Sequence, residues 1–225
     1  MTSPVRSRRK LRILTTIAAV FVVVVAAVLV TAARDNEGAR SSGESSSAAP
    51  VSAVRPDSHR LSTAADGRVT LVEFLDFECE ACRAAYPLVE RLREEYGDRV
   101  SFVVRYFPIP SHFNAERAAR SVEAAAQQGR FEQMYQRMYE TQAGWGEQRV
   151  PADEVFRGFA ADLGLDLAAY DAAYNDPATL DRVRSDFNDG IALGVQGTPT
   201  FFVNDEMVTA NSYEDLAEAL DSALG

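Results

Sequence analysis

Apolar residues between positions 69 and 107 fall into patterns typical of alternating strands and helices. The runs at residues 69–75 (VTLVEFL) and 100–107 (VSFVVRYF) are nearly continuous and β-prone, as in strands covered on both faces. Between them, apolar residues recur at helical spacing from Ala85 to Tyr96, and Gly97 supplies a stop signal. This pattern predicts a βαβ unit with a right-handed crossover.

The following segment is predicted to be helical, and it leads into a hairpin and a last helix. Residues 111–194 carry apolar stripes at helical spacing, which indicate packing rather than a cofactor site. Residues 200–203 (TFFV) and a short partner at residues 207–208 predict a β-hairpin. Ser212, with Asp215 three residues later, marks the start of the final helix. The predicted order is β-α-β, a helical block, and β-β-α, which is an α/β fold.

An uncharged apolar stretch near the N-terminus predicts a membrane segment. Residues 13–33 contain 21 positions without a charge, and as a helix they would reach roughly 32 Å, enough to span a bilayer. Residues 1–12 carry five cations, so the positive-inside rule predicts a cytoplasmic N-terminus and a single-pass anchor in the cell membrane. The alternative is a cleaved signal peptide, which would release a secreted domain. Both interpretations place the rest of the chain outside the cytoplasm.

The next segment is predicted to be a flexible linker. Residues 34–60 hold seven serines and few large apolar side chains, so they cannot bury a core of their own. The folded domain is therefore expected to span residues 61–225.

Charge and composition exclude several classes of function. Residues 61–225 contain 14 Lys and Arg against 29 Asp and Glu, and a nucleic acid partner is not expected because phosphate binding needs a cationic face. Lys10 is the only lysine in the chain. No P-loop lysine or Schiff-base lysine can therefore exist after it.

The two cysteines of the chain, Cys79 and Cys82, are the strongest candidates for chemistry. They follow the first predicted strand at the start of a helix, where two intervening residues bring the sulfurs within bonding reach and the helix N-terminus favours a thiolate on Cys79. This predicts a redox pair in which Cys79 is the exposed attacking sulfur and Cys82 the deeper resolving sulfur. Two alternatives remain open: an inert disulfide, and a zinc site that would also need His59 and His112.

Three segments resemble the DsbA-like branch of the thioredoxin superfamily, in its membrane-anchored bacterial form. They are VEFLDFECEAC, the Thr198-Pro199 step in GVQGTPTFFVN, and the helical block between them. The resemblance covers about residues 61–225 and implies a thioredoxin fold with a helical insertion at about residues 111–194. It also implies an enzyme that needs no cofactor or metal beyond the Cys79–Cys82 disulfide.

The resemblance assigns roles to three further residues. Pro199 would be cis and face the cysteines, and Thr198 would offer backbone hydrogen bonds to a bound peptide. Glu73 matches a buried acid that assists proton transfer at the resolving cysteine. Independently, a carboxylate inside an apolar strand is costly to ionise and can shuttle a proton near neutral pH. The alternatives are a trans proline that starts a strand and a strand glutamate turned to solvent.

The sequence departs from the best-known oxidases of the family between the cysteines. Those enzymes have proline and histidine where this chain has Glu80 and Ala81, and Glu78 stands just before Cys79. Carboxylates near the sulfur disfavour a thiolate, so we expect a Cys79 pKa well above 4 and a less oxidising disulfide. We expect His112 to be a capping or surface residue.

These observations predict an extracytoplasmic thiol:disulfide oxidoreductase that introduces disulfides into exported proteins. A DsbB-like or VKOR-like membrane partner would reoxidise the cysteine pair. The alternatives are a reductase or isomerase with the same fold, a tethered peptide-binding holdase without redox turnover, and a metal-handling domain.

Overall fold

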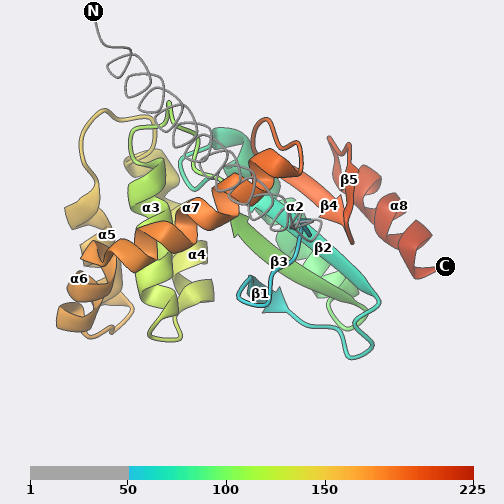
Figure 1. Ribbon diagram of the computed structural model, residues 1–225, viewed down its shortest axis with the longest axis horizontal. Coiled ribbons are helices and arrows are strands. Elements are labelled where there is room, and N and C mark those ends of the chain that lie inside the picture. The colour runs from blue at the N-terminus through green and yellow to red at the C-terminus, as the bar shows by residue number, and fades with distance from the viewer. Residues whose placement is uncertain (1–50) are drawn as a thin grey trace, which may run out of the picture. The chain divides into compact units, whose positions relative to one another are not determined.

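A five-stranded mixed sheet forms the centre of the computed structural model, which describes residues 51–225 (Figure 1). The strand order is β1-β3-β2-β4-β5. The central strands β2 and β3 are parallel, and the other neighbouring strands are antiparallel. The strands are β1 (His59–Ser62), β2 (Val69–Leu75), β3 (Val100–Tyr106), β4 (Thr200–Val203) and β5 (Glu206–Val208).

Helices pack on the sheet and form the segment between β3 and β4 (Figure 1). The α-helices are α2 (Glu80–Tyr96), α3 (Ala115–Ala126), α4 (Phe131–Thr141), α5 (Asp153–Asp162), α6 (Leu167–Asn175), α7 (Pro177–Ala192) and α8 (Tyr213–Leu224), and the 3₁₀ helix η1 (Gln142–Gly144) follows α4. The predicted βαβ and ββα halves, with helices between them, are confirmed. The result is a thioredoxin-like α/β fold with a helical insertion.

The side chains of β2 alternate between two apolar layers, as the period of a strand requires. Val72 and Phe74 belong to one cluster with Phe187 of α7. Leu71 and Leu75 belong to the larger cluster, which includes buried residues of α2 and α8. Because Glu73 lies between Leu71 and Leu75 in this alternation, its side chain is directed to the same layer as α2.

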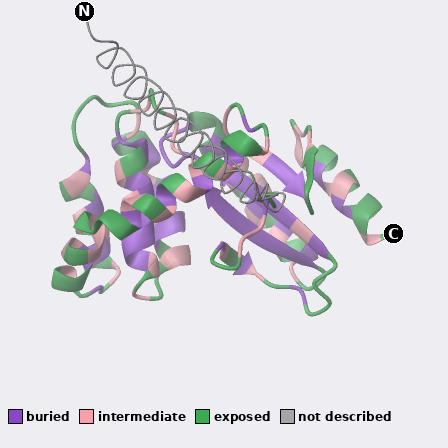
Figure 2. Cartoon of the chain, in the orientation of Figure 1, coloured by how far each residue is buried: buried purple, intermediate pink, exposed green. Residues whose placement is uncertain are grey.

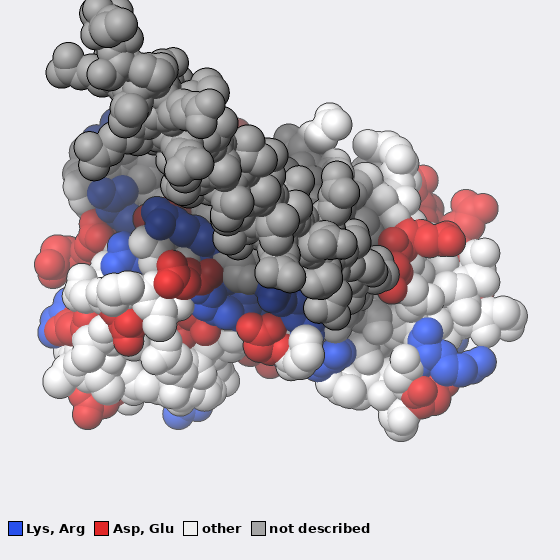
Figure 3. Space-filling view, in the orientation of Figure 1, with Lys and Arg blue, Asp and Glu red and all other residues white. Residues whose placement is uncertain are grey.

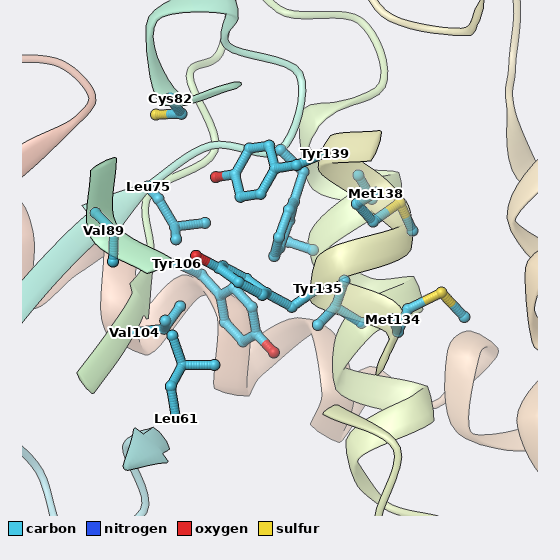
Figure 4. Close-up of a cluster of buried hydrophobic side chains, with 14 of the residues drawn as sticks. Leu61, Leu75, Cys82, Val89, Val104, Tyr106, Met134, Tyr135, Met138 and Tyr139 are labelled. Carbon is cyan, nitrogen blue, oxygen red and sulfur yellow. The ribbon is translucent and has the colours of Figure 1, made fainter. Parts of the chain in front are cut away.

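The helical insertion packs through small and aromatic side chains. The buried face of α3 is rich in alanine, which lets neighbouring helices approach closely; Figure 2 shows this helix largely buried. Tyr135 and Tyr139 of α4 lie toward Leu75, Tyr106 and Cys82 (Figure 4). The insertion and the thioredoxin-like part therefore share one continuous core.

The folded domain begins earlier than predicted, so the boundary at residue 61 is too late. Residues 59–62 form the edge strand β1 against β3, and Ala53 is fully buried. The Ala53 N–H donates to Asp205 at 3.0 Å, and its carbonyl accepts from the buried Arg105 guanidinium at 2.7 Å. This segment is held by long-range hydrogen bonds rather than by large apolar side chains, and so its composition resembled a linker.

The predicted N-terminal tail, the membrane segment at residues 13–33 and the linker up to residue 50 lie outside the described residues. Within residues 51–225, no helix has both the length and the apolar character needed to cross a bilayer.

Candidate active site

The cysteine pair lies where α2 begins, directly after the loop that follows β2. Cys79 is the N-cap of α2 and Cys82 lies in its first turn, and both are free thiols. The Cys79 thiol donates to the backbone carbonyl of Thr198 at 3.4 Å, and the Thr198–Pro199 peptide is cis. Two segments 119 residues apart in the chain thus meet at one sulfur, as the resemblance implies.

The two sulfurs differ in access. Cys82 is fully buried, whereas Cys79 retains 9% of its surface. Cys79 is therefore the more accessible of the two, although it is less exposed than expected because the Thr198–Pro199 turn lies against it.

The surroundings of the pair favour a thiolate on Cys79 alone. The Cys79 pKa is lowered to about 6. The largest cause is a hydrogen bond from Cys82. Burial acts in the opposite direction, and contacts with Thr198 and with the first N–H groups of α2 lower the pKa further. Burial raises the pKa of Cys82 well above its ordinary value. Near neutral pH, the outer sulfur is therefore largely a thiolate and the inner one stays protonated.

A Cys79 pKa of about 6 lies above 4, as the hypothesis drawn from the CEAC sequence expects. However, Glu78 does not act through closeness to the sulfur. Its buried carboxylate accepts the backbone N–H of Asn114 at 2.5 Å and that of Glu147 at 3.1 Å, both in the helical insertion. Glu78 therefore ties the active-site loop to the insertion, a role that the sequence did not reveal.

Glu73 is buried below the cysteine pair, with 4% of its surface exposed. Burial, together with repulsion from Glu90 and Cys79, raises the Glu73 pKa to about 8. Its negative charge in turn contributes to the raised pKa of Cys82. The alternative of a solvent-facing glutamate is wrong for this strand. Near neutral pH, Glu73 is therefore largely protonated.

A carboxylate–imidazole pair stands beside the cysteines and was not predicted. The His112 ring atom Nδ1 lies 2.6 Å from Oδ2 of Asp76, which is fully buried. The Asp76 carboxylate also accepts hydrogen bonds from the N–H groups of Glu78 at 2.8 Å and Ile109 at 2.9 Å. The backbone carbonyl of Asp76 accepts the Cys79 N–H at 3.2 Å. The bond to Asp76 raises the His112 pKa to about 9. His112 is thus an ion-paired residue of the site rather than a surface cap.

Gln142 of η1 braces the same loop from the insertion. Its buried side-chain amide donates to the carbonyl of Phe77 at 2.7 Å and to that of Cys79 at 2.9 Å. We expect Gln142→Ala to lower the free energy of unfolding by about 1–3 kcal/mol, because two buried carbonyls lose their donor. Denaturant unfolding of the full chain measures this loss. The matched control is Gln148→Ala, since Gln148 bonds the Gly144 carbonyl at an exposed position; equal losses for the two variants would contradict the bracing role.

An apolar hollow of about 330 Å³ opens beside the cis proline. Its walls come from the exposed side of α2, from Pro199 and Phe201, and from the start of α8. The hollow has room for an apolar side chain of a peptide that lies along the Thr198–Pro199 turn.

The zinc site considered from the sequence is not assembled. His59 pairs with Glu123 at 2.6 Å on the edge strand, whereas His112 pairs with Asp76. Across residues 51–225, no group of three or more His, Cys, Asp or Glu side chains is arranged to hold a metal ion.

A cysteine pair at a helix N-terminus, with a cis-proline turn against one of its sulfurs and a helical insertion in the fold, is typical of a thioredoxin-like protein. A thioredoxin family model matches residues 62–222. The chain therefore belongs to the thioredoxin family, and its fold is that of the DsbA-like branch.

Solved structures resemble the chain over most of their length. A thioredoxin-like oxidoreductase from Silicibacter pomeroyi DSS-3 is 27% identical with a TM-score of 0.63, and the match covers 75% of this chain and 93% of that one. BdbD from Bacillus subtilis is 20% identical with a TM-score of 0.64, over 72% of this chain and 91% of that one. At that identity, BdbD supports the fold alone.

The curated relatives are much longer proteins. The Na(+)/H(+) antiporter NhaA of Herminiimonas arsenicoxydans is 37% identical over 150 residues, which are 67% of this chain and 23% of the relative. NhaA 1 of Mycolicibacterium vanbaalenii is 33% identical over 154 residues, 67% of this chain and 24% of the relative. The chain thus spans about a quarter of the length of these relatives.

Proposed function

We propose that the chain is a thiol:disulfide oxidoreductase that introduces disulfides into exported proteins through Cys79 and Cys82. The observation that carries this proposal is the position of the Cys79 sulfur, at the N-terminus of α2 and 3.4 Å from the Thr198 carbonyl. A client peptide paired with the Thr198–Pro199 turn would present its own sulfur to Cys79. The apolar hollow beside Pro199 would hold a neighbouring side chain.

The proposed reaction starts from the Cys79–Cys82 disulfide. A client thiolate attacks the Cys79 sulfur, the bond to Cys82 breaks, and Cys82 leaves as a thiolate that takes the proton of Glu73. A second client thiolate then attacks the client sulfur of the mixed disulfide and releases Cys79 as a thiolate. The client loses two electrons, and the cysteine pair gains them.

Completion of the cycle requires an oxidant for the reduced pair. We propose a DsbB-like or VKOR-like membrane protein in this role, with residues 13–33 holding the domain at the outer face of the cell membrane. Recovery of the full chain in the membrane fraction, with residues 51–225 cut by protease added to intact spheroplasts, would support this placement. Protection of the domain from that protease would contradict it.

A nucleic acid partner is not part of the proposal. On the face shown in Figure 3, basic and acidic side chains are interspersed. Binding to a phosphate backbone depends instead on a concentrated positive surface.

The test is a redox titration combined with two assays on the full chain. We expect one two-electron transition in glutathione buffers, oxidation of a reduced two-cysteine client, and slower reduction of insulin. Absence of thiol exchange in both assays would contradict the proposal and favour the holdase. Faster insulin reduction than client oxidation would favour a reductase, which the moderately acidic Cys79 also permits.

A further inference from the structure

The Asp76–His112 pair is built into the loop that carries the nucleophile. The Asp76 carboxylate is held by three partners: His112 Nδ1 and the N–H groups of Glu78 and Ile109. The backbone carbonyl of Asp76 holds the Cys79 N–H. Because Asp76 occupies Nδ1 of the ring, the other ring nitrogen is free, and the His112 side chain keeps 23% of its surface. The imidazole is therefore anchored to the residue whose carbonyl holds the Cys79 N–H, and it is partly open to solvent.

The charges around this imidazole favour its protonated form. Asp76 pairs with it directly, and the carboxylates of Glu78 and Glu147 interact with it from the active-site loop and from the segment after η1. Glu116 and Arg184 line the same surface hollow as His112 and pair with each other at 3.4 Å. The Cys79 thiolate is one of the groups that raise the His112 pKa. By linkage, a protonated His112 favours the thiolate of Cys79, alongside the larger effects of the hydrogen bond from Cys82 and of the first N–H groups of α2.

The residues between the cysteines carry no cation. Glu80 is an exposed acid and Ala81 is apolar, so no positive side chain stands between the two sulfurs. His112, in the segment between β3 and α3, is 33 residues from Cys79 in the chain, and the fold brings it to the loop that carries this sulfur.

We propose that His112, held protonated by the buried Asp76, is a positioning residue that stabilises the thiolate of Cys79 and so tunes the redox pair. The role rests on the proposed function, in which Cys79 is the attacking sulfur. His112, from the segment between β3 and α3, supplies the positive charge that the Glu80–Ala81 dipeptide lacks.

The first test removes and restores the charge in the reduced full chain, with thiolate absorbance followed against pH. We expect His112→Gln to raise the Cys79 pKa, so that the thiolate fraction at pH 5 falls about threefold. His112→Arg should retain most of the thiolate. His59→Gln is the matched control, because His59 also bonds a carboxylate at 2.6 Å but lies on the edge strand. An unchanged Cys79 pKa in a folded His112→Gln variant would overturn the proposal.

The second test needs no substitution, because the chain has only two histidines. NMR titration of their ring signals in the reduced and oxidised wild-type chain gives each imidazole pKa, with His59 as the internal reference. We expect the His112 pKa to fall on oxidation, because the disulfide carries no negative charge. Equal His112 values in the two redox states would overturn the coupling. A chain that shows the coupling but exchanges no disulfides would contradict the proposed function while leaving this inference intact.

Discussion

Cys79→Ser is expected to reduce client oxidation and insulin reduction to the rate measured without protein. Cys79 is the more accessible of the two sulfurs, and it alone has a pKa lowered to about 6. A serine hydroxyl at the same N-cap is neither ionised near neutral pH nor able to form a disulfide. The fold should persist, because Ser is a preferred N-cap residue. Initial rates at pH 7, with circular dichroism as a check of folding, measure the effect.

Cys82→Ser is the matched control for this prediction. It removes the resolving sulfur but leaves the attacking one, so the mixed disulfide that forms when the Cys79 thiolate attacks a disulfide of insulin should accumulate and be visible on a non-reducing gel. Cys79→Ser should form no such adduct. Equal activity of wild type and Cys79→Ser would contradict a redox role and favour peptide binding without turnover.

The central fold could be predicted because its signals are local. Strands β2 and β3 can be predicted from continuous apolar runs, and the start of α8 from its Ser212 cap. Each of these signals spans only a few residues. Strand β1 carries no such signal. Its four residues, HRLS, include one buried side chain, and they are extended because β3 offers an unpaired edge. Likewise, Ala53 is buried because the buried Arg105 binds its carbonyl, a contact across 52 residues that no local pattern encodes.

The same difference between local signals and long-range contacts applies to the candidate active site. The CxxC spacing and the Thr198–Pro199 step are local motifs, and the alternation of β2 directs Glu73 inward. The Asp76–His112 pair instead depends on how the segment after β3 folds back. Glu78 was interpreted with the wrong neighbour for the same reason, since its partners lie 36 and 69 residues away. An acid in the loop after a buried strand is a weak signal for such a tie between distant segments, but it does not identify the partner.

Glu73→Gln is expected to change how stability depends on pH. The folded-state pKa of Glu73, about 8, lies above its ordinary value of 4.5. The proton on Glu73 therefore stabilises the folded wild type fully below pH 4.5, and this contribution is lost as the pH rises toward 8. Glutamine has no such proton to lose. Between pH 5 and pH 9, the free energy of unfolding of Glu73→Gln relative to wild type should rise by about 4 kcal/mol. Chemical denaturation of both oxidised proteins across this range measures the difference without titrating thiols.

The change with pH is more informative than the difference at any single pH. A buried amide has its own hydrogen-bonding cost, which shifts the whole curve of the variant but not its slope. Glu80→Gln is the matched control, because Glu80 is exposed at the start of α2 and its neutralisation should leave the slope unchanged. If the Glu73→Gln curve runs parallel to that of wild type, Glu73 is already ionised at pH 5. It could then not supply the proton that Cys82 takes on leaving, and that proton would have to come from solvent or from the client.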